Sequence, residues 1–366
     1  MKLAGFNLFR FALPLARMII IKDEKITERT GLLIELVDEQ GHTGLGECSP
    51  LPGLCSENLG LAESQLLSLC YALKGTRVPE NLEELSGGFE RWLERFNLSP
   101  SVRFGFETAI LNLLAESRKL PLRRLISDRS HDYISINGLL AGSTGEILDK
   151  AVRLRDEGYK AIKLKVGHRP LLEDITLTRR VCECIGGNIA LRLDANRAWS
   201  IEDALIFVRG VADCHIDYIE EPVHSYKMLT AMSNESDLLP FAIDESLQEL
   251  TSESLTPLPN LKAIVLKPTL LGFERSMQFA HRAVSFGITP VVSSTFETSL
   301  GLTSLAEFAA CLNTTDIPVG LDTLDWFAED LLMQPIRISR GQLSLSNSVV
   351  HPEHIRKDLL QEIAHV

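Results

Sequence analysis

The stretch Ala161-Ile162-Lys163-Leu164-Lys165 is an apolar run that ends in a positive charge, and four runs of the same kind follow it along the chain. Each run is largely apolar before its charged end and is bounded by turn residues, which is typical of a buried parallel strand. Helix-length amphipathic segments separate the runs, so the pattern predicts repeated βα units that close into a barrel. The later runs cover residues 189–194, 216–221, 241–245 and 263–267.

The rest of the chain predicts a second, smaller domain. A βα barrel needs roughly 200 to 250 residues, and the chain has 366. We expect an α+β domain over residues 1–100, the barrel over residues 101–322, and a tail, 323–366, that is a candidate to return to the first domain. In the first domain the sequence predicts strands at 6–11 and 31–37 around a polar segment at 22–30, a rigid glycine- and proline-rich turn at 44–53, and helices at 59–73 and 89–96.

The barrel is expected to start with a helix at residues 102–117 and a first strand at 134–138. Its last two strands are predicted at 288–294 and 317–322. The eight strands would end at Asn137, Lys165, Asp194, Glu220, Asp244, Lys267, Ser294 and Asp322.

Composition and charge exclude several classes of partner. The formal charge of −12 argues against nucleic acid, whose phosphates are bound by clustered Lys and Arg. No uncharged apolar run approaches the length that spans a membrane. Seven cysteines without the spacing of a disulfide framework favour reduced thiols. We therefore expect a cytoplasmic protein without nucleic acid or membrane as a partner, and the sequence leaves its oligomeric state unknown. The charged strand ends point to a small-molecule carboxylate as the substrate.

Three carboxylates, Asp194, Glu220 and Asp244, end three successive predicted strands, which places them side by side at the active face. Three like charges need a cation. Oxygen ligands without His or Cys favour a hard ion, so we predict Mg²⁺, with Mn²⁺ as the alternative. The adjacent acids Glu221 and Glu245 are expected to point away from the site.

Lysines flank the predicted metal site on both sides. Lys163 and Lys165 are two residues apart and therefore on one face of their strand, whereas Lys267 ends a strand beyond the three acidic ones. A nearby divalent ion and a second cation disfavour the charged form of a lysine and lower its pKa, so that it can accept a proton. These groups suit the removal of a proton next to a carboxylate, with the resulting charge held by the metal and a lysine. A Lys base combined with Mg²⁺ is a known arrangement for this chemistry, and the enolase superfamily is its standard example.

Several motifs resemble the muconate-lactonising subgroup of the enolase superfamily, and within it the o-succinylbenzoate synthase family. The resemblance runs from about residue 27 to 325, and Cys48 stands where that family often has another apolar residue. The motifs are Gly46-Glu47-Cys48-Ser49-Pro50, Lys163-Leu164-Lys165, Asp194-Ala195-Asn196, Glu220-Glu221-Pro222, Asp244-Glu245-Ser246, Lys267-Pro268-Thr269 and Ser293-Ser294-Thr295.

The resemblance implies a modified TIM-type (β/α)₇β barrel with an N-terminal α+β capping domain. It implies a lyase of menaquinone biosynthesis that eliminates water from 2-succinyl-6-hydroxy-2,4-cyclohexadiene-1-carboxylate to give o-succinylbenzoate. Lys165 would be the base and then the acid, Lys163 would help to hold its state, and Lys267 would stabilise the charge that develops. Further roles are implied for Arg192 and Asn196, which would support the metal, and for Ser293, Ser294 and Thr295, which with residues 27–31 would bound the succinyl end.

Other functions remain open. The same lysines and metal would serve an N-succinylamino acid racemase or a dipeptide epimerase. Dipeptide epimerases usually carry an Asp-x-Asp pair after the eighth strand, whereas here Asp322 and Asp325 are separated by two residues. A barrel that has lost catalysis and serves as a binding or structural protein is a third interpretation, which the intact set of charged strand ends disfavours.

Overall fold

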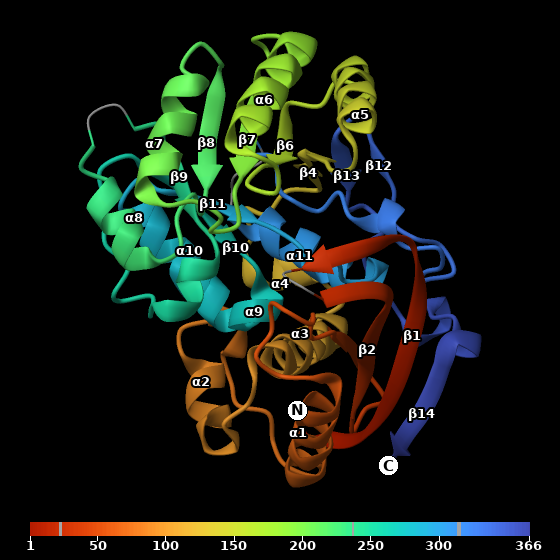
Figure 1. Ribbon diagram of the computed structural model, residues 1–366. Helices are drawn as coiled ribbons and strands as arrows, with labels where there is room; N and C mark the ends of the chain where they lie inside the picture. Colours follow the sequence, from red (N-terminus) through yellow and green to blue (C-terminus); the bar gives the residue numbers. More distant parts are fainter. Residues whose placement is uncertain (22–23, 236–237, 313–315) are drawn as a thin grey trace.

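The computed structural model describes residues 1–21, 24–235, 238–312 and 316–366. A sheet of seven parallel strands, in the order β11-β10-β9-β8-β7-β6-β5, curls through the upper half of the molecule in Figure 1. The predicted fold class, an α/β barrel with a capping domain, is confirmed. The strands are β5 (Gly138–Leu140), β6 (Ala161–Lys165), β7 (Ala190–Asp194), β8 (Ile216–Glu220), β9 (Phe241–Ile243), β10 (Leu261–Leu266) and β11 (Thr289–Val292).

Helices follow the barrel strands and cover the outside of the sheet (Figure 1). The start of α7 is capped by Ser200, whose side chain accepts a hydrogen bond from the Asp203 backbone N–H. The helices are α5 (Thr144–Asp156), α6 (Leu171–Ile185), α7 (Ile201–Gly210), α8 (Tyr226–Met232), α9 (Pro268–Leu271), α10 (Phe273–Ser285) and α11 (Ser299–Cys311).

The two ends of the barrel sheet differ from the prediction. The first barrel strand is β5, whereas β4 (Tyr133–Ser135), which falls in the predicted first strand, pairs with β13 (Gln342–Ser344) in a separate sheet completed by β12 (Ile338–Ser339). The predicted strand at 317–322 is reduced to isolated parallel bridges, from Val319 to Ile136 and from Gly320 to Ser293. These bridges join the two edges of the sheet and close the barrel.

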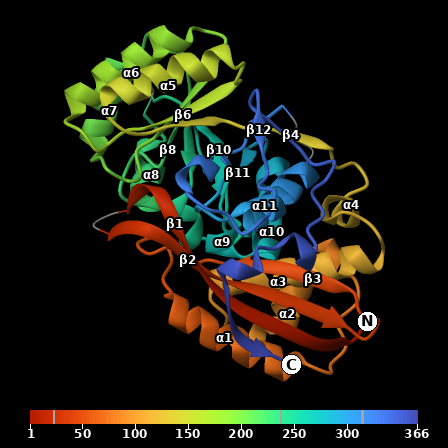
Figure 2. The ribbon, with the colours of Figure 1, turned by 90° about the vertical axis from the view of Figure 1, so that its right-hand side faces the viewer.

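The capping domain is an antiparallel sheet in the order β14-β1-β2-β3, with helices on one side (Figure 2). The tail returns to it, because β14 pairs with β1. The predicted domain boundary at residue 100 remains a prediction, and α3 packs on β2 and β3 of this sheet. The elements are β1 (Leu3–Ile21), β2 (Glu24–Asp38), β3 (Thr43–Cys48), β14 (Leu360–His365), α1 (Leu59–Leu73), α2 (Gly88–Leu93), α3 (Pro100–Ser117) and α4 (Leu122–Ile126).

Strand β2 is covered on both faces. Leu32 and Ile34 belong to the main core, which includes residues of α1 and α3, whereas Leu33 packs with Leu45 and with Leu300 of barrel helix α11. Alternate side chains therefore contact the helices and the barrel, which explains the nearly continuous apolar stretch in this strand. Most of the predicted polar segment, from Glu24 onward, is also strand, and residues 22 and 23 lie outside the described residues.

The predicted rigid turn at 44–53 is wrong in its first half, which is strand β3. Glycine is required there for close packing. A Cβ atom on Gly44 would lie 2.1 Å from the Ala109 carbonyl oxygen, and one on Gly46 would lie 2.0 Å from that of Gly105. Both contacts are with α3, so the glycines let this helix approach the strand directly.

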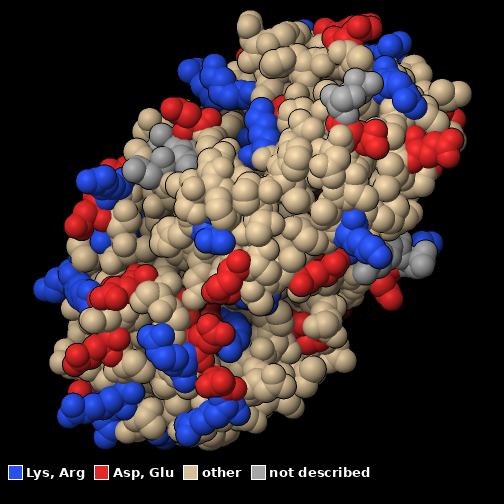
Figure 3. All heavy atoms as spheres, turned by 90° about the vertical axis from the view of Figure 1, so that its left-hand side faces the viewer, with Lys and Arg blue, Asp and Glu red and all other residues tan. Residues whose placement is uncertain are grey.

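The remaining turns of helix are short 3₁₀ segments. They cover Leu82–Glu84, Glu94–Phe96, Glu245–Glu249, Leu324–Trp326, Pro352–His354 and Lys357–Leu359. Among the described residues, no helix combines the length and apolar character needed to cross a membrane. The face shown in Figure 3 carries Lys and Arg interspersed with Asp and Glu.

Candidate active site

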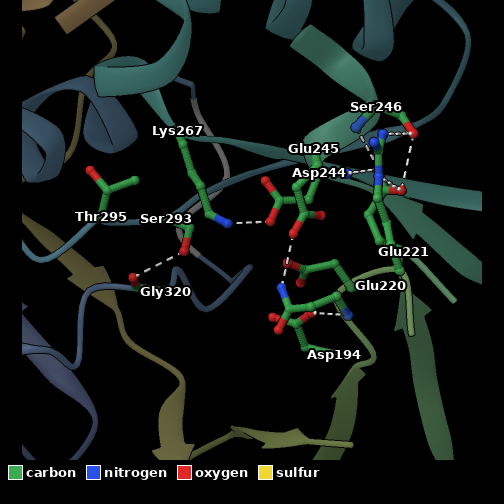
Figure 4. A network of polar contacts seen from close by, with 12 residues as sticks. Asp194, Glu220, Glu221, Asp244, Glu245, Ser246, Lys267, Ser293, Thr295 and Gly320 are labelled. Atoms are coloured by element: carbon green, nitrogen blue, oxygen red, sulfur yellow. Dashed lines mark hydrogen bonds and ion pairs between the residues drawn. The ribbon is translucent and has the colours of Figure 1, made fainter. Parts of the chain in front are cut away.

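Strand register brings the predicted acidic residues into one layer at the barrel mouth. Lys165 is paired with Asp194, and Asp194 with Glu220, across the parallel strands β6, β7 and β8. Asp244 directly follows β9, and Lys267 directly follows β10. The three carboxylates are almost completely buried, and Figure 4 shows them side by side.

Each of the three lysines contacts one or more of these carboxylates. Lys163 Nζ lies 2.8 Å from Asp194 Oδ2 and 2.8 Å from Glu220 Oε1. Lys165 Nζ donates to Asp194 Oδ2 at 2.6 Å, and Lys267 Nζ donates to Asp244.

The lysines differ in their access to solvent. The Lys165 side chain is 33% exposed, compared with 10% for Lys163 and 9% for Lys267. Lys165 is therefore the amine that a molecule entering the barrel mouth reaches most easily, whereas Lys163 lies below it on the same strand.

The lysine pKa values differ from the expectation. Burial lowers the pKa of Lys163, but the charges of Asp194 and Glu220 outweigh it and raise that pKa well above its usual value. Burial also lowers the pKa of Lys267, and the charge of Asp244 more than offsets it, so that this pKa is raised too. The sequence predicted lowered lysine pKa values. For these two lysines the protein groups act in the opposite direction, because the carboxylates are in direct contact with the amines.

The carboxylates are affected unequally by the same surroundings. Burial, reinforced by the charge of Asp194, raises the pKa of Glu220 well above its usual value, and burial also raises the pKa of Asp244. For Asp194 the effect of burial is outweighed by Lys163 and Lys165, which lower its pKa.

The oxygen atoms of the three carboxylates suit a hard cation, although they also contact the lysines. Glu220 Oε2 is buried and lies 2.8 Å from Lys163 Nζ, without a hydrogen bond of good geometry. All three acids offer oxygen ligands to one region of the mouth. In the described part of the chain, no three His, Cys, Asp or Glu side chains already surround a single point as metal ligands do. Asp194, Glu220 and Asp244 thus offer the oxygen ligands that a divalent ion prefers at one barrel mouth, and the metal site remains a proposal.

Glu221, which directly follows Glu220, stabilises the end of a neighbouring strand. Glu221 is fully buried in a left-handed conformation, with φ of 41°. Its carboxylate accepts hydrogen bonds from the backbone N–H groups of Asp244 and Ser246, at 2.9 and 2.7 Å. Glu221 therefore fixes the main chain that carries Asp244, as Figure 4 shows. The sequence placed Glu221 outside the site but contained no sign of this role, because the contact depends on its unusual φ.

Asn196 connects the base candidate to another acid. Its Oδ1 accepts a hydrogen bond from Lys165 Nζ at 2.7 Å, and its Nδ2 donates to Glu245 Oε1 at 2.9 Å. Asn196 therefore lies next to Lys165 and Asp194, and its supporting role remains a prediction. Asn196 has φ of 44°, so a second strained residue occurs at a strand end.

Arg192 lies away from the three carboxylates, in contrast to the predicted place beside the metal. Its guanidinium donates to Asp217 Oδ2 at 3.0 Å, to Asn137 Oδ1 at 3.2 Å and to the carbonyl of Pro318, and it lies over the Tyr218 ring. The reason is its position two residues before Asp194 on β7, which puts it one layer deeper in the barrel. Arg192 therefore joins the strands below the site.

The serines predicted to bound the substrate lie opposite the acidic strands. Ser293 donates to the Gly320 carbonyl at 3.3 Å, and the hydroxyl groups of Ser294 and Thr323 are 2.9 Å apart. Figure 4 places Ser293 and Thr295 next to the Lys267 side chain. Their contact with a substrate remains a prediction.

Two family models match the chain. "Enolase C-terminal domain-like" matches residues 146–349, more than half of the chain, and "MenC, N-terminal domain" matches residues 3–113. The o-succinylbenzoate synthase of Haemophilus influenzae is 32% identical over 336 residues, which are 88% of this chain and 90% of that protein. The chain belongs to the o-succinylbenzoate synthase family.

Other members and neighbours agree with this family membership. The o-succinylbenzoate synthase of Vibrio cholerae is 33% identical and is covered to 91%. The protein PHYLLO of Arabidopsis thaliana, a chloroplastic protein, is 31% identical, but the chain spans only 20% of its length.

Solved structures share the fold with this member of the enolase superfamily. A dipeptide epimerase from Enterococcus faecalis, complexed with Mg and a dipeptide, has a TM-score of 0.80 at 22% identity, with 94% of this chain and 98% of that chain covered. A muconate lactonizing enzyme from Pseudomonas fluorescens, complexed with muconolactone, has a TM-score of 0.82 at 22% identity, with 94% of both chains covered. At this identity the two structures support the fold alone.

Proposed function

We propose that the protein is a Mg²⁺-dependent o-succinylbenzoate synthase, a carbon–oxygen lyase that supplies menaquinone biosynthesis. It would convert 2-succinyl-6-hydroxy-2,4-cyclohexadiene-1-carboxylate to o-succinylbenzoate and water. The observation that carries the proposal is the pair of lysines at the barrel mouth: the more exposed Lys165 on one side and the buried Lys267, held by Asp244, on the other. The relatives at 32% and 33% identity favour this reaction over others of the superfamily.

In the proposed reaction Lys165, as the neutral amine, takes the proton from the ring carbon that bears the carboxylate. The electron pair of the broken C–H bond then forms the new ring double bond as hydroxide leaves the adjacent carbon. Lys165 returns its proton to that hydroxide, so one water is released and the ring becomes aromatic. A single lysine suffices because proton and hydroxide leave from the same face.

Lys267 would supply positive charge opposite Lys165. Its ammonium is buried, and a charge in such surroundings stabilises developing negative charge more strongly than one in water. Asp194, Glu220 and Asp244 would hold Mg²⁺, which when bound would neutralise charge on the substrate carboxylate. Asn196 would orient Lys165 through its hydrogen bond.

The test is turnover by the purified protein with Mg²⁺. Loss of the cyclohexadiene and formation of the aromatic product are followed by ultraviolet absorbance, and the product mass must be lower by one water. A chelator-treated sample and Lys165→Ala serve as controls. Absence of aromatic product with Mg²⁺ present would contradict the proposal.

A racemase or epimerase is the second candidate, because lysines on two sides of the mouth could exchange a proton on either face of a substrate carbon. Asp322 does not favour dipeptides: its carboxylate accepts from the Leu139 backbone N–H at 3.0 Å and lies 3.5 Å from Lys150 Nζ, so it is engaged in the barrel wall. Chiral chromatography of N-succinylamino acids and dipeptides incubated with the protein would detect this activity.

A further inference from the structure

Arg29 of strand β2 is a charged side chain buried between the two domains. Only 1% of its surface is exposed. A guanidinium has five N–H groups, and each donates here to a different main-chain carbonyl. Three acceptors belong to the capping domain and two to the barrel: Thr30, Pro50 and Ser49, at 3.3, 3.1 and 2.6 Å, and Thr295 and Phe296, at 3.3 and 3.0 Å.

The two barrel acceptors form a strained turn. Phe296 has φ of 61°, a conformation that is strained for a non-glycine residue and persists only where its surroundings hold it. Arg29 Nε binds the Phe296 carbonyl, and Glu297 Oε2 accepts from the Thr295 N–H at 2.7 Å. The Phe296 ring packs edge-on against Trp326, with ring centroids 5.4 Å apart.

This turn connects the two groups predicted to face the substrate. Thr295 directly follows Ser293 and Ser294. Glu297 also accepts a hydrogen bond from the hydroxyl of Thr269, which stands two residues after Lys267. The contacts therefore run from Arg29 through the turn to the serines on one side and to the segment that follows Lys267 on the other. Figure 4 shows Lys267, Ser293 and Thr295 together.

We propose that Arg29 is a positioning residue, which docks the capping domain on the Thr295–Phe296 turn and thereby sets the serines relative to Lys267. All five N–H groups of Arg29 are engaged by main-chain carbonyls, so it acts through the main chain. The inference rests on the proposed function, because it assigns the serines and Lys267 to one substrate. The inference also requires a guanidinium at position 29. A lysine ammonium has only three N–H groups and cannot donate to five carbonyls.

The experiment compares Arg29→Met and Arg29→Lys with a matched control, Arg123→Met. Arg123 of α4 is also buried and pairs with Glu307 at 2.8 Å. Its other side-chain partners are Asp132 and Ser348, which are not site residues. Activity is expressed per folded molecule, with folding checked by circular dichroism at a temperature below every unfolding transition. We expect Arg29→Met to lose about 10²-fold in kcat/KM, the scale of a reacting group displaced by about 1 Å. Arg123→Met should unfold at lower temperature but keep its activity while folded.

A second readout does not depend on the reaction. The fluorescence of Trp326, taken as the difference between a protein and its Trp326→Phe counterpart, should change in Arg29→Met and stay the same in Arg123→Met. Should Arg29→Met fail to fold, Arg29→Lys takes its place, with a loss of activity expected although the charge is kept. The proposal is overturned if folded Arg29→Lys or Arg29→Met retains wild-type kcat/KM and an unchanged Trp326 signal. An inactive wild type would instead contradict the proposed function, and the Trp326 signal would then decide the role of Arg29.

Discussion

Replacing Lys165 should separate catalysis from stability more cleanly than replacing Lys163 on the same strand. Loss of a general acid–base group costs about 10²- to 10⁴-fold in rate, which at 1.36 kcal/mol per tenfold is about 2.7–5.4 kcal/mol of transition-state stabilisation. Lys165 is 33% exposed, and Asp194 keeps Lys163 as a partner when Lys165 is removed. Solvent screens the charge of this partly exposed amine, so Lys165→Ala should lose less stability than the removal of a fully buried lysine.

Lys163→Ala is the contrasting variant. It removes a buried ammonium that contacts both Asp194 and Glu220, and breaking a buried ion pair costs about 3–5 kcal/mol because a charge is left uncompensated. It should therefore lower the melting temperature markedly.

The assay is exchange of the substrate proton with deuterated solvent, read by mass spectrometry or NMR, together with turnover and thermal unfolding of both variants. Lys165→Ala should abolish exchange. If it turns over at a near wild-type rate, or if Lys267→Ala alone removes exchange while Lys165→Ala leaves it intact, the base lies on the other side of the ring and the assignment is wrong.

Three further predictions concern the remaining charges. Lys267→Arg should retain part of the activity, because a cation remains opposite the base, whereas Lys267→Ala should lose most of it; equal activities in steady-state kinetics would argue against an electrostatic role. Asp244→Asn should weaken Mg²⁺ binding and activity together, and an unchanged affinity in titration calorimetry would remove Asp244 from the metal site. Burial raises the pKa of Glu107 to about 7 from 4.5, so the folded state binds its proton more tightly than the unfolded state and stability should fall as pH rises through that range. Glu107→Gln should lessen this fall in melting temperature, because an amide does not titrate. The Gln carbonyl oxygen can still accept from the Phe273 and Glu274 N–H groups, as Glu107 Oε2 does at 2.8 and 3.0 Å.

The acidic face of the barrel could be predicted because it depends on local signals. Each strand is a short apolar run, and parallel strands in register bring their ends to one edge. Lys165, Asp194 and Glu220 end β6, β7 and β8, as predicted, while Asp244 and Lys267 fall one residue beyond β9 and β10. This difference of one residue in the strand ends leaves the predicted site intact, because the Asp244 and Lys267 side chains still face the barrel mouth.

The closing strand and the contacts between domains could not be predicted in the same way. Residues 317–322 show an apolar pattern, but strand formation there depends on where the edges β5 and β11 come to lie. Glu47 accepts hydrogen bonds from the backbone N–H groups of Thr298 and Gly301, at 3.1 and 2.9 Å, and caps helix α11 from the other domain. A contact of this kind between two domains leaves no periodic pattern in the sequence. The only hint was the charge of Glu47 within an otherwise apolar and glycine-rich stretch, which suggests a buried carboxylate with hydrogen-bond partners.

The charges at the mouth connect the fold to the proposed chemistry. Three carboxylates, Asp194, Glu220 and Asp244, stand against three ammonium groups, those of Lys163, Lys165 and Lys267, so the six groups sum to zero when all are ionised. An excess of either sign would be costly in a site whose acids are almost fully buried. The proposed substrate carries two carboxylates, one on the ring and one on the succinyl chain, and Mg²⁺ carries two positive charges. Bound together they add no net charge to the site, whereas either alone would add two charges of one sign, and the two are therefore expected to favour each other's binding.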